Sequence, residues 1–167
     1  MSYKLVYYGN ETLASVAEAV NNIDGAVASL IDEMFEIMHR EIGIGLAAPQ
    51  IDLAKRVIVV DTGEGPGTKI ALVNPVIKEK SLSTEPFDEG CLSLPGINAE
   101  VIRPSKILVS GYNRDGKEVE FEADGLLARV LQHEVDHLDG IVFVDRIEKY
   151  RKDELRSELK RIKKMNR

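Results

Sequence analysis

The sequence predicts an α+β fold in a single domain, residues 1–167. Segments of strand-like composition occupy the middle of the chain, whereas helical periodicity is found near the start and again in the last third. This order differs from the regular alternation of strands and helices that gives a parallel sheet. The length of 167 residues and the 44% of hydrophobic residues suit one domain with a sizeable core.

The first predicted element is a helix that begins after Asp24, a suitable N-cap, and ends near Arg40. Apolar residues recur along it at spacings of three and four, which gives the helix one apolar face. This face consists of Val27, Leu30, Ile31, Met34, Ile37 and Met38. His39 stands alone near the end of the helix and is interpreted as a structural or surface histidine.

Short segments rich in β-branched residues follow the helix and predict strands. They are Arg56–Asp61, Ile70–Asn74, Ile77–Leu82, Ile107–Tyr112 and Glu118–Glu122. The run Gly63–Gly67 (GEGPG) predicts a loop between the first two strands. The run Asn113–Gly116 predicts the turn of a β-hairpin between the last two.

The last third of the chain predicts two helices and a short strand. Asp124 is expected to cap a helix over Gly125–Leu138, and Asp139-Gly140 ends it. Ile141–Val144 predicts a short strand. A third helix is expected over Arg146–Met165. Its broad apolar face contains Ile147, Tyr150, Leu155, Leu159, Ile162 and Met165.

Charge and composition exclude several classes of protein. The net charge of −6 argues against general nucleic-acid binding, and we expect no DNA partner. Residues 146–167 carry a net +6, so the acidic body of the chain ends in a basic segment. No apolar run approaches the roughly 20 residues of a membrane span, and the first residues lack the pattern of a secretory or transit peptide. We therefore expect a cytoplasmic protein without a membrane partner, whose one cysteine forms no internal disulfide.

The strongest motif is the HExxH sequence His133-Glu134-Val135-Asp136-His137, inside the second predicted helix. On a helix, His137 lies one turn beyond His133 on nearly the same face, so both imidazoles can reach one metal ion. Glu134 lies beside that face. Two satisfied histidines on a helix are the alternative, but Glu134 and the helical setting both favour a metal site.

A catalytic metal site needs a third protein ligand. No histidine follows His137, and Glu154 and Glu158 lie in a highly charged helix where solvated side chains are expected. Upstream, Cys91 lies in the segment Glu89–Pro95 (EGCLSLP), and its thiolate would complete a Cys/His/His set. Beside an incomplete HExxH motif, we interpret Cys91 as the ligand.

A third segment, Gly43–Gln50 (GIGLAAPQ), combines two glycines and two alanines that leave the backbone open to a close approach. Gln50 could place an amide donor in a site. On its own, this segment reads as a helix C-cap glycine followed by a loop.

Together the three segments resemble peptide deformylase, whose pattern is GφGφAAPQ, then EGCφS, then HEφDH, with φ apolar. This chain has GIGLAAPQ, EGCLS and HEVDH in the same order, over a span that covers more than half of its length. Many relatives carry an Arg after a Leu near the start, where this chain has Leu13-Ala14. The resemblance is to bacterial members with a C-terminal helix. It implies antiparallel β-sheets packed around a central helix that bears HEVDH, with an N-terminal helix and a long C-terminal helix.

The resemblance also implies an activity, namely removal of the formyl group from N-formylmethionyl nascent peptides with release of formate. The metal ligands map onto Cys91, His133 and His137. Glu134 maps onto the general base. The backbone N–H of Leu92 and the side-chain amide of Gln50 map onto donors to the developing oxyanion.

The substrate is implied to lie extended and to pair with backbone near Ile44, Gly45 and Gly90. Leu126 and Val130, on the metal-facing side of their helix, are expected to line the pocket for the methionine side chain. Arg129 is expected near the pocket rim, where contact with the peptide and simple solvation both remain open.

The family typically uses Fe²⁺, and Zn²⁺, Ni²⁺ or Co²⁺ also suit the ligand set in purified protein. The apolar face of the basic C-terminal helix is interpreted as a cover on the body of the domain. Its Lys/Arg face is either solvated or in contact with the ribosome, where the substrate originates. Two alternatives to the deformylase remain at this point. One is a zincin peptidase with Glu158 as the third ligand. The other is a non-enzyme, either a structural metal module or a relative of the deformylases that has lost catalytic activity.

Overall fold

The computed structural model describes residues 3–65 and 69–166. Its helices are α1 (Gly25–Arg40), α2 (Gly125–Leu138), α3 (Lys149–Glu154) and α4 (Arg156–Lys163), with 3₁₀ helices at Ala48–Ile51 and Phe143–Asp145. Its strands are β1 (Gly45–Ala47), β2 (Val57–Asp61), β3 (Lys69–Lys80), β4 (Thr84–Gly90), β5 (Asn98–Pro104), β6 (Lys106–Tyr112) and β7 (Glu118–Asp124). Pro66 and Gly67, the last part of the expected GEGPG loop, lie outside the described residues.

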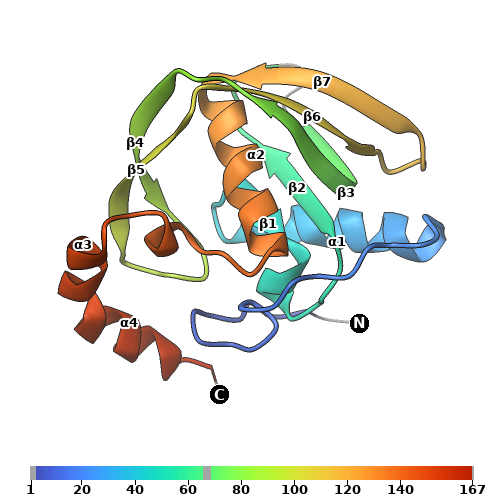
Figure 1. Cartoon of the computed structure of the whole chain (residues 1–167). Coiled ribbons are helices and arrows are strands. Elements are labelled where there is room, and N and C mark those ends of the chain that lie inside the picture. The colour runs from blue at the N-terminus through green and yellow to red at the C-terminus, as the bar shows by residue number, and fades with distance from the viewer. Residues whose placement is uncertain (1–2, 66–68, 167) are drawn as a thin grey trace.

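Two antiparallel sheets lie on either side of α2 (Figure 1). The first sheet has five strands in the order β1-β2-β3-β6-β7, and the second consists of the hairpin β4-β5. The predicted α+β class and the central position of the HEVDH helix are confirmed. No helix within the two described ranges is both long and apolar enough to cross a bilayer.

The five-stranded sheet is covered on both faces, as the sequence of β2 shows. Side chains alternate between the faces of a strand. Val57 and Val59 belong to the hydrophobic cluster that contains the apolar face of α1, with Met34 and Met38 at its centre. Ile58 and Val60 point the other way, into the cluster formed with α2. β2 is therefore apolar from Val57 to Val60, because a helix covers each of its faces.

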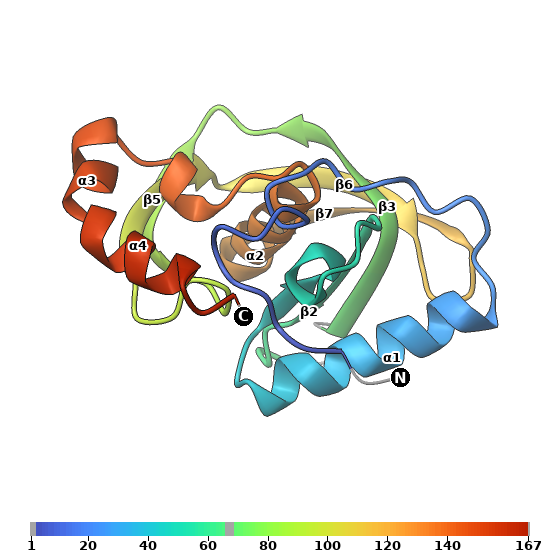
Figure 2. The same ribbon diagram turned by 90° about the horizontal axis from the view of Figure 1, so that it is seen from below.

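The two-stranded sheet contributes to a third apolar cluster, and it meets α2 through polar contacts such as that between Glu89 and Arg129. This cluster joins β5 to the 3₁₀ helix at Phe143–Asp145 and to α4, and includes Val101, Phe143 and Ile162. The C-terminal helices thus rest on the small sheet and not on the large one (Figure 2).

Several predicted elements differ from those observed. Ile141–Val144 is not a strand, since the chain passes there into the 3₁₀ helix at Phe143–Asp145. The helix expected over Arg146–Met165 is two helices that meet at Leu155. The two strands expected over Ile70–Asn74 and Ile77–Leu82 are one strand, β3, which ends at Lys80. It has register shifts between Val73 and Val76 and between Ile77 and Glu79. The sequence did not predict β1, β4 or β5.

The N-terminal segment is held by hydrogen bonds to residues beside the cavity and to the residue that follows α4. The backbone N–H groups of Val6 and Tyr8 donate to the carbonyls of Gln50 and Ser93. The Asn166 side chain, just after α4, accepts from Tyr7 N at 2.8 Å and donates to the carbonyls of Tyr7 and Tyr8 at 2.9 and 3.1 Å. These three hydrogen bonds, here called the clasp, join the residues just after α4 to the segment Tyr7–Tyr8 (Figure 2).

Candidate metal centre

Helix α2 brings two imidazoles together in the interior of the molecule. His133 and His137 lie one turn apart, with ring centroids 5.0 Å from each other. Every residue of α2 from Ala128 to Leu138 is buried, because a sheet covers the helix on each side. Burial lowers the pKa of His137 well below its ordinary value, which favours the neutral imidazole that binds metals.

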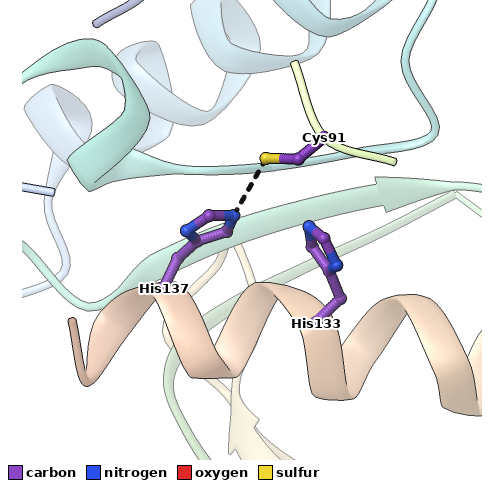
Figure 3. A group of neighbouring side chains, drawn as sticks. All are labelled: Cys91, His133 and His137. Carbon is purple, nitrogen blue, oxygen red and sulfur yellow. Dashed lines mark hydrogen bonds between the residues drawn. The ribbon is translucent and has the colours of Figure 1, made fainter. Parts of the chain in front are cut away.

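Cys91 approaches this pair from the loop that follows β4 (Figure 3). Its Sγ lies 3.4 Å from Nε2 of His137, and the ligand atoms of Cys91, His133 and His137 all lie within 4.8 Å of one another. One thiolate and two imidazoles suit a first-row divalent metal, and three protein ligands are the number found in catalytic sites. The three residues therefore fit a catalytic metal centre.

Glu158 does not take part in this arrangement. It is exposed on α4, and Cys91, His133 and His137 form the one group of three potential ligands found among residues 3–65 and 69–166. A zincin site with Glu158 as the third ligand is therefore excluded.

Glu134 places an unpaired carboxylate oxygen beside the centre. Its side chain is buried, and Oε1 has no hydrogen-bond partner within the described structure. Burial, which disfavours the ionised form, raises the pKa of Glu134 to about 7. A carboxyl group with a pKa near neutrality and no fixed partner is suited to accept and return a proton.

A cavity of about 450 Å³ opens next to Glu134 and extends between β1 and β4. All seven of the residues predicted to serve as oxyanion donors or to bind substrate line it: Ile44, Gly45, Gln50, Gly90, Leu92, Leu126 and Val130. The sequence analysis missed Ile42, Phe87 and Asn98, which also line it. Phe87 and Asn98 lie on strands that were not predicted, so no pattern pointed to them.

The amide of Gln50 is held in a fixed orientation. Gln50 lies in the 3₁₀ helix at Ala48–Ile51, and its Oε1 accepts a hydrogen bond from Ala47 N at 2.9 Å. Its Nε2 donates to Ser93 Oγ at 3.2 Å and lies 3.5 Å from Cys91 Sγ. Because the carbonyl end is bound to backbone, the NH₂ end must face the metal ligands.

Glu89 is the most highly bonded side chain of the site, and its role was missed in the sequence. Its Oε1 accepts from His133 Nδ1 at 2.9 Å and from Arg103, and its Oε2 accepts from Arg103 and Arg129. Burial alone raises the pKa of Glu89, but the hydrogen bonds and charges of His133 and Arg103 outweigh it and lower the pKa to about 2. The only signal in the sequence was an acidic residue immediately before Gly90-Cys91.

The network continues from Glu89 to the surface through Asp136, the fourth residue of the HEVDH motif. Arg103 donates its third nitrogen, Nη1, to Asp136 Oδ2 at 2.8 Å. Arg146 binds both carboxylate oxygens of Asp136, at 2.7 and 3.1 Å. Buried charges are stable only when they are paired in this way.

Arg129 lies at the cavity wall, and one of the two roles left open for it, simple solvation, does not fit. Its side chain is only 9% exposed, so it is not a solvated surface group. Its guanidinium donates to Glu89 Oε2, to the carbonyl of Val101 and to the carbonyl of Glu85. The Phe87 ring lies over it at 5.5 Å. His39, in contrast, lies at the surface as expected, 3.0 Å from Asp61.

Comparison with known proteins agrees with this geometry. Residues 2–153 match the family model described as polypeptide deformylase. The chain is 52% identical to a peptide deformylase of Halothermothrix orenii, over 83% of this chain and 89% of that protein. It is 45% identical to that of Brachyspira hyodysenteriae, over 98% and 90%. Among solved structures, a plant peptide deformylase superposes with a TM-score of 0.91 at 39% identity, covering 98% of this chain and 90% of that one.

Proposed function

Because this chain belongs to the polypeptide deformylase family, we propose roles in the deformylase reaction for the residues that line its central cavity. Members of this family are metal-dependent hydrolases that remove the formyl group from the N-terminus of nascent peptides, and this chain is such an enzyme. The reaction cleaves a linear amide and releases formate.

Cys91, His133 and His137 would hold the metal ion. The observation that carries this assignment is the cluster of their ligand atoms within 4.8 Å, beside a cavity that Glu134 also lines. A divalent ion bound there supplies Lewis acidity, which lowers the pKa of water and polarises a carbonyl oxygen.

Glu134 is the general base in this proposal. Its unpaired Oε1 and its pKa of about 7 suit a group that takes a proton from the attacking water. The same carboxyl group then returns the proton to the amine that leaves as the new N-terminus. A single side chain therefore serves both halves of the reaction.

Gln50 Nε2 and the backbone N–H of Leu92 donate to the oxygen that becomes negative during attack on the formyl carbon. The bond from Ala47 N to Gln50 Oε1 supports this role, because it fixes the direction of the amide before the substrate arrives. Loss of one preorganised donor of this kind costs about 3 kcal/mol of transition-state stabilisation.

The substrate lies extended between β1 and β4. β1 is the first strand of its sheet, so one of its edges is available for pairing with a peptide near Ile44 and Gly45, while Gly90 ends β4 on the opposite side. Backbone pairing tolerates varied side chains. Leu126 and Val130 line the pocket that receives the methionine side chain.

We assign Fe²⁺ as the metal in the cell, with Zn²⁺, Ni²⁺ or Co²⁺ as replacements in purified protein. The single thiolate among the ligands is compatible with each of these ions. Metal analysis of protein purified without oxygen tests the assignment, and an iron content well below that of zinc would contradict it.

The basic C-terminal segment is proposed to contact ribosomal RNA. Residues 146–167 carry a net +6, and Lys149, Arg156 and Lys160 are exposed on α3 and α4. Binding through such charges weakens steeply as salt rises. Co-sedimentation with ribosomes at increasing salt tests this contact, and absent or salt-insensitive binding would contradict it.

We further propose that residues 1–167 form one catalytic domain that acts in the cytoplasm. The position of α2 between both sheets supports a single unit, because neither sheet covers the helix without the other. A cytoplasmic location is supported by the substrate class, since nascent chains are made there.

Release of formate from an N-formylmethionyl peptide tests the function directly. The protein is prepared without oxygen, loaded with Fe²⁺, and compared with Glu134→Gln. We expect activity in the parent and near-total loss in the variant at equal metal content. Glu122→Gln, an exposed carboxylate on β7, is the matched control and should remain active. An inactive parent with one bound metal would overturn the proposal.

A further inference from the structure

The carboxylate of Glu89 is saturated with donors. Oε1 accepts from His133 Nδ1 at 2.9 Å and Arg103 Nη2 at 3.0 Å, while Oε2 accepts from Arg103 Nε at 2.7 Å and Arg129 Nη1 at 2.8 Å. An ionised carboxylate has about four acceptor positions, and all are filled. The orientation of the carboxylate is therefore set jointly by the guanidinium groups of Arg103 and Arg129. The remaining acceptor position faces His133 Nδ1.

Arg129 and His133 both donate hydrogen bonds to Glu89, and both belong to α2. They lie four residues apart on α2, so their side chains occupy the same face one turn from each other. Glu89, between them, belongs to β4. The position of β4 relative to α2 is thus fixed at the residue that binds the imidazole.

Arg129 also ties both strands of the small sheet to the helix. Nη1 donates to the carbonyl of Val101 on β5 at 2.8 Å, and Nη2 donates to the carbonyl of Glu85 on β4 at 2.5 Å. Arg103 does not bind these carbonyls, because two of its nitrogens donate to Glu89 and the third donates to Asp136. Arg129 is therefore the residue that connects the carboxylate, both strands and the helix.

We propose that Arg129 is a positioning residue that acts through Glu89, holding this carboxylate against His133 Nδ1 so that Nε2 of the imidazole faces Cys91 and His137. The inference rests on the proposed metal site. Partners of metal-binding histidines orient the ring, and their loss typically weakens metal affinity by about 10–100-fold. Both terminal nitrogens of Arg129 already donate to protein oxygens and its side chain is 9% exposed, so a bond from either nitrogen to the peptide would have to replace one of these contacts.

The test is the affinity for Zn²⁺, measured by competition with a chromogenic chelator on folded protein. We expect Arg129→Met to weaken Zn²⁺ binding by about 10–100-fold. Arg129→Lys retains a cation beside Glu89 and should lose only several-fold. Arg114→Met is the matched control, since Arg114 pairs with Asp32 at the surface, and its Zn²⁺ affinity should equal that of the parent.

A double-mutant cycle with Glu89→Gln distinguishes positioning from a general structural role. If Arg129 acts through Glu89, Arg129→Met should add little further loss of Zn²⁺ affinity in the Glu89→Gln background. Fully additive losses would overturn the inference. So would an Arg129→Met variant that melts earlier but binds Zn²⁺ as tightly as the parent.

The experiment also decides the question if Arg129→Met does not fold or if the parent binds no Zn²⁺. If Arg129→Met does not fold, Arg129→Lys is measured alone against Arg114→Lys. An ammonium group cannot bind Glu89 and both carbonyls at once, so unchanged Zn²⁺ affinity would then overturn the inference. If the parent itself binds no Zn²⁺, the proposed metal site is wrong. If the parent binds Zn²⁺ and the Arg129 variant binds it equally well, only the inference about Arg129 is wrong.

Discussion

A methyl group at Gly45 would lie 2.5 Å from Oε2 of Glu134 and 2.8 Å from Cγ1 of Val130. Gly45→Ala must therefore displace Glu134, the proposed general base, or Val130, which lines the cavity. We expect kcat/KM to fall by about tenfold or more, since small displacements of reacting groups are costly. Metal content should not change, because the three atoms nearest to this methyl group belong to Glu134 and Val130 and not to the proposed metal ligands. Steady-state kinetics on a formyl peptide, with metal analysis, check this.

Gly25→Ala is the matched control for Gly45→Ala. Gly25 begins α1, and a methyl group there meets nothing within 4 Å. This variant should keep full activity and be at least as stable as the parent, because alanine favours the helix. Full activity in Gly45→Ala would contradict the close approach described here.

Glu89 gives the second residue-scale prediction, a pH dependence of stability. Its pKa is about 2 in the folded protein against 4.5 ordinarily. A depressed carboxyl pKa stabilises the fold above pH 4.5, and this contribution is lost as the pH falls from 4.5 towards 2. The shift corresponds to roughly 3 kcal/mol.

Urea unfolding of metal-free protein across this pH range measures the effect. Between pH 4.5 and 2 the parent should lose more stability than Glu89→Gln. This variant is expected to be less stable at neutral pH, and it retains the contributions of other carboxylates with lowered pKa values, such as Asp32 and Asp153. Parallel curves for the two proteins would contradict the assignment of this titration to Glu89.

At this scale, the residues that the sequence predicted are those joined by local spacing. His133, Glu134 and His137 share one helix turn, so periodicity alone brings them together. The bonds from Arg103 to Glu89 and Asp136 join residues 14 and 33 positions apart across two strands that were not predicted. Their partnership depends on strand register, and no local pattern encodes it.

At the scale of elements, the C-terminal helices show how packing overrides a regular pattern. The apolar face predicted for one helix would require six side chains to be buried together. In the structure Leu159 and Ile162 are buried, but Tyr150 and Met165 are exposed. The break at Leu155 turns α4 so that its two buried residues reach the small sheet.

Ile162→Ala tests this contact. Ile162 is fully buried against the cluster that includes Val101 and Phe143. Removing its side chain should lower the free energy of unfolding by about 2–4 kcal/mol, and denaturant titration measures this. Tyr150→Ala, on the exposed side of α3, should change it by less than about 0.5 kcal/mol. Equal effects of the two substitutions would contradict the packing of α4.

The strands β4 and β5 were not predicted, because contacts with other elements and not a local apolar pattern stabilise them. The sequence of β4, TEPFDEG, contains three acidic residues and a proline, and most of its side chains are exposed. A strand of this kind carries no apolar alternation. It forms because β5 pairs with it along its length and because Arg129 and Arg103 bind its polar groups.

For the whole molecule, metal binding is expected to stabilise the fold. Cys91 follows β4, whereas both histidines lie on α2, so a bound ion connects the small sheet to the central helix. Removal of the metal with a chelator should lower the melting temperature measured by calorimetry. An ion present at 100 times its Kd contributes about 2.7 kcal/mol.

Cys91→Ser is the control for this experiment, because its weakened site should make the melting temperature respond much less to the chelator. An equal response in parent and variant would show that the chelator acts elsewhere than on this site.

The overall fold class followed from the sequence because it depends on the order of elements, which local patterns provide. The division of the strands into two sheets did not. β3 pairs with β6 across an intervening hairpin, and the pair includes register shifts near Asn74. Such pairing is decided by contacts over long sequence separations, which a single sequence does not display.

The clasp between Asn166 and the segment Tyr7–Tyr8 joins positions 159 residues apart. Translation proceeds from the N-terminus, so the segment Tyr7–Tyr8 is made well before the Asn166 side chain that binds it. The same N-terminal segment bonds to the carbonyls of Gln50 and Ser93 beside the cavity. A chain whose synthesis has not yet reached Asn166 therefore leaves this segment beside the cavity without those three hydrogen bonds.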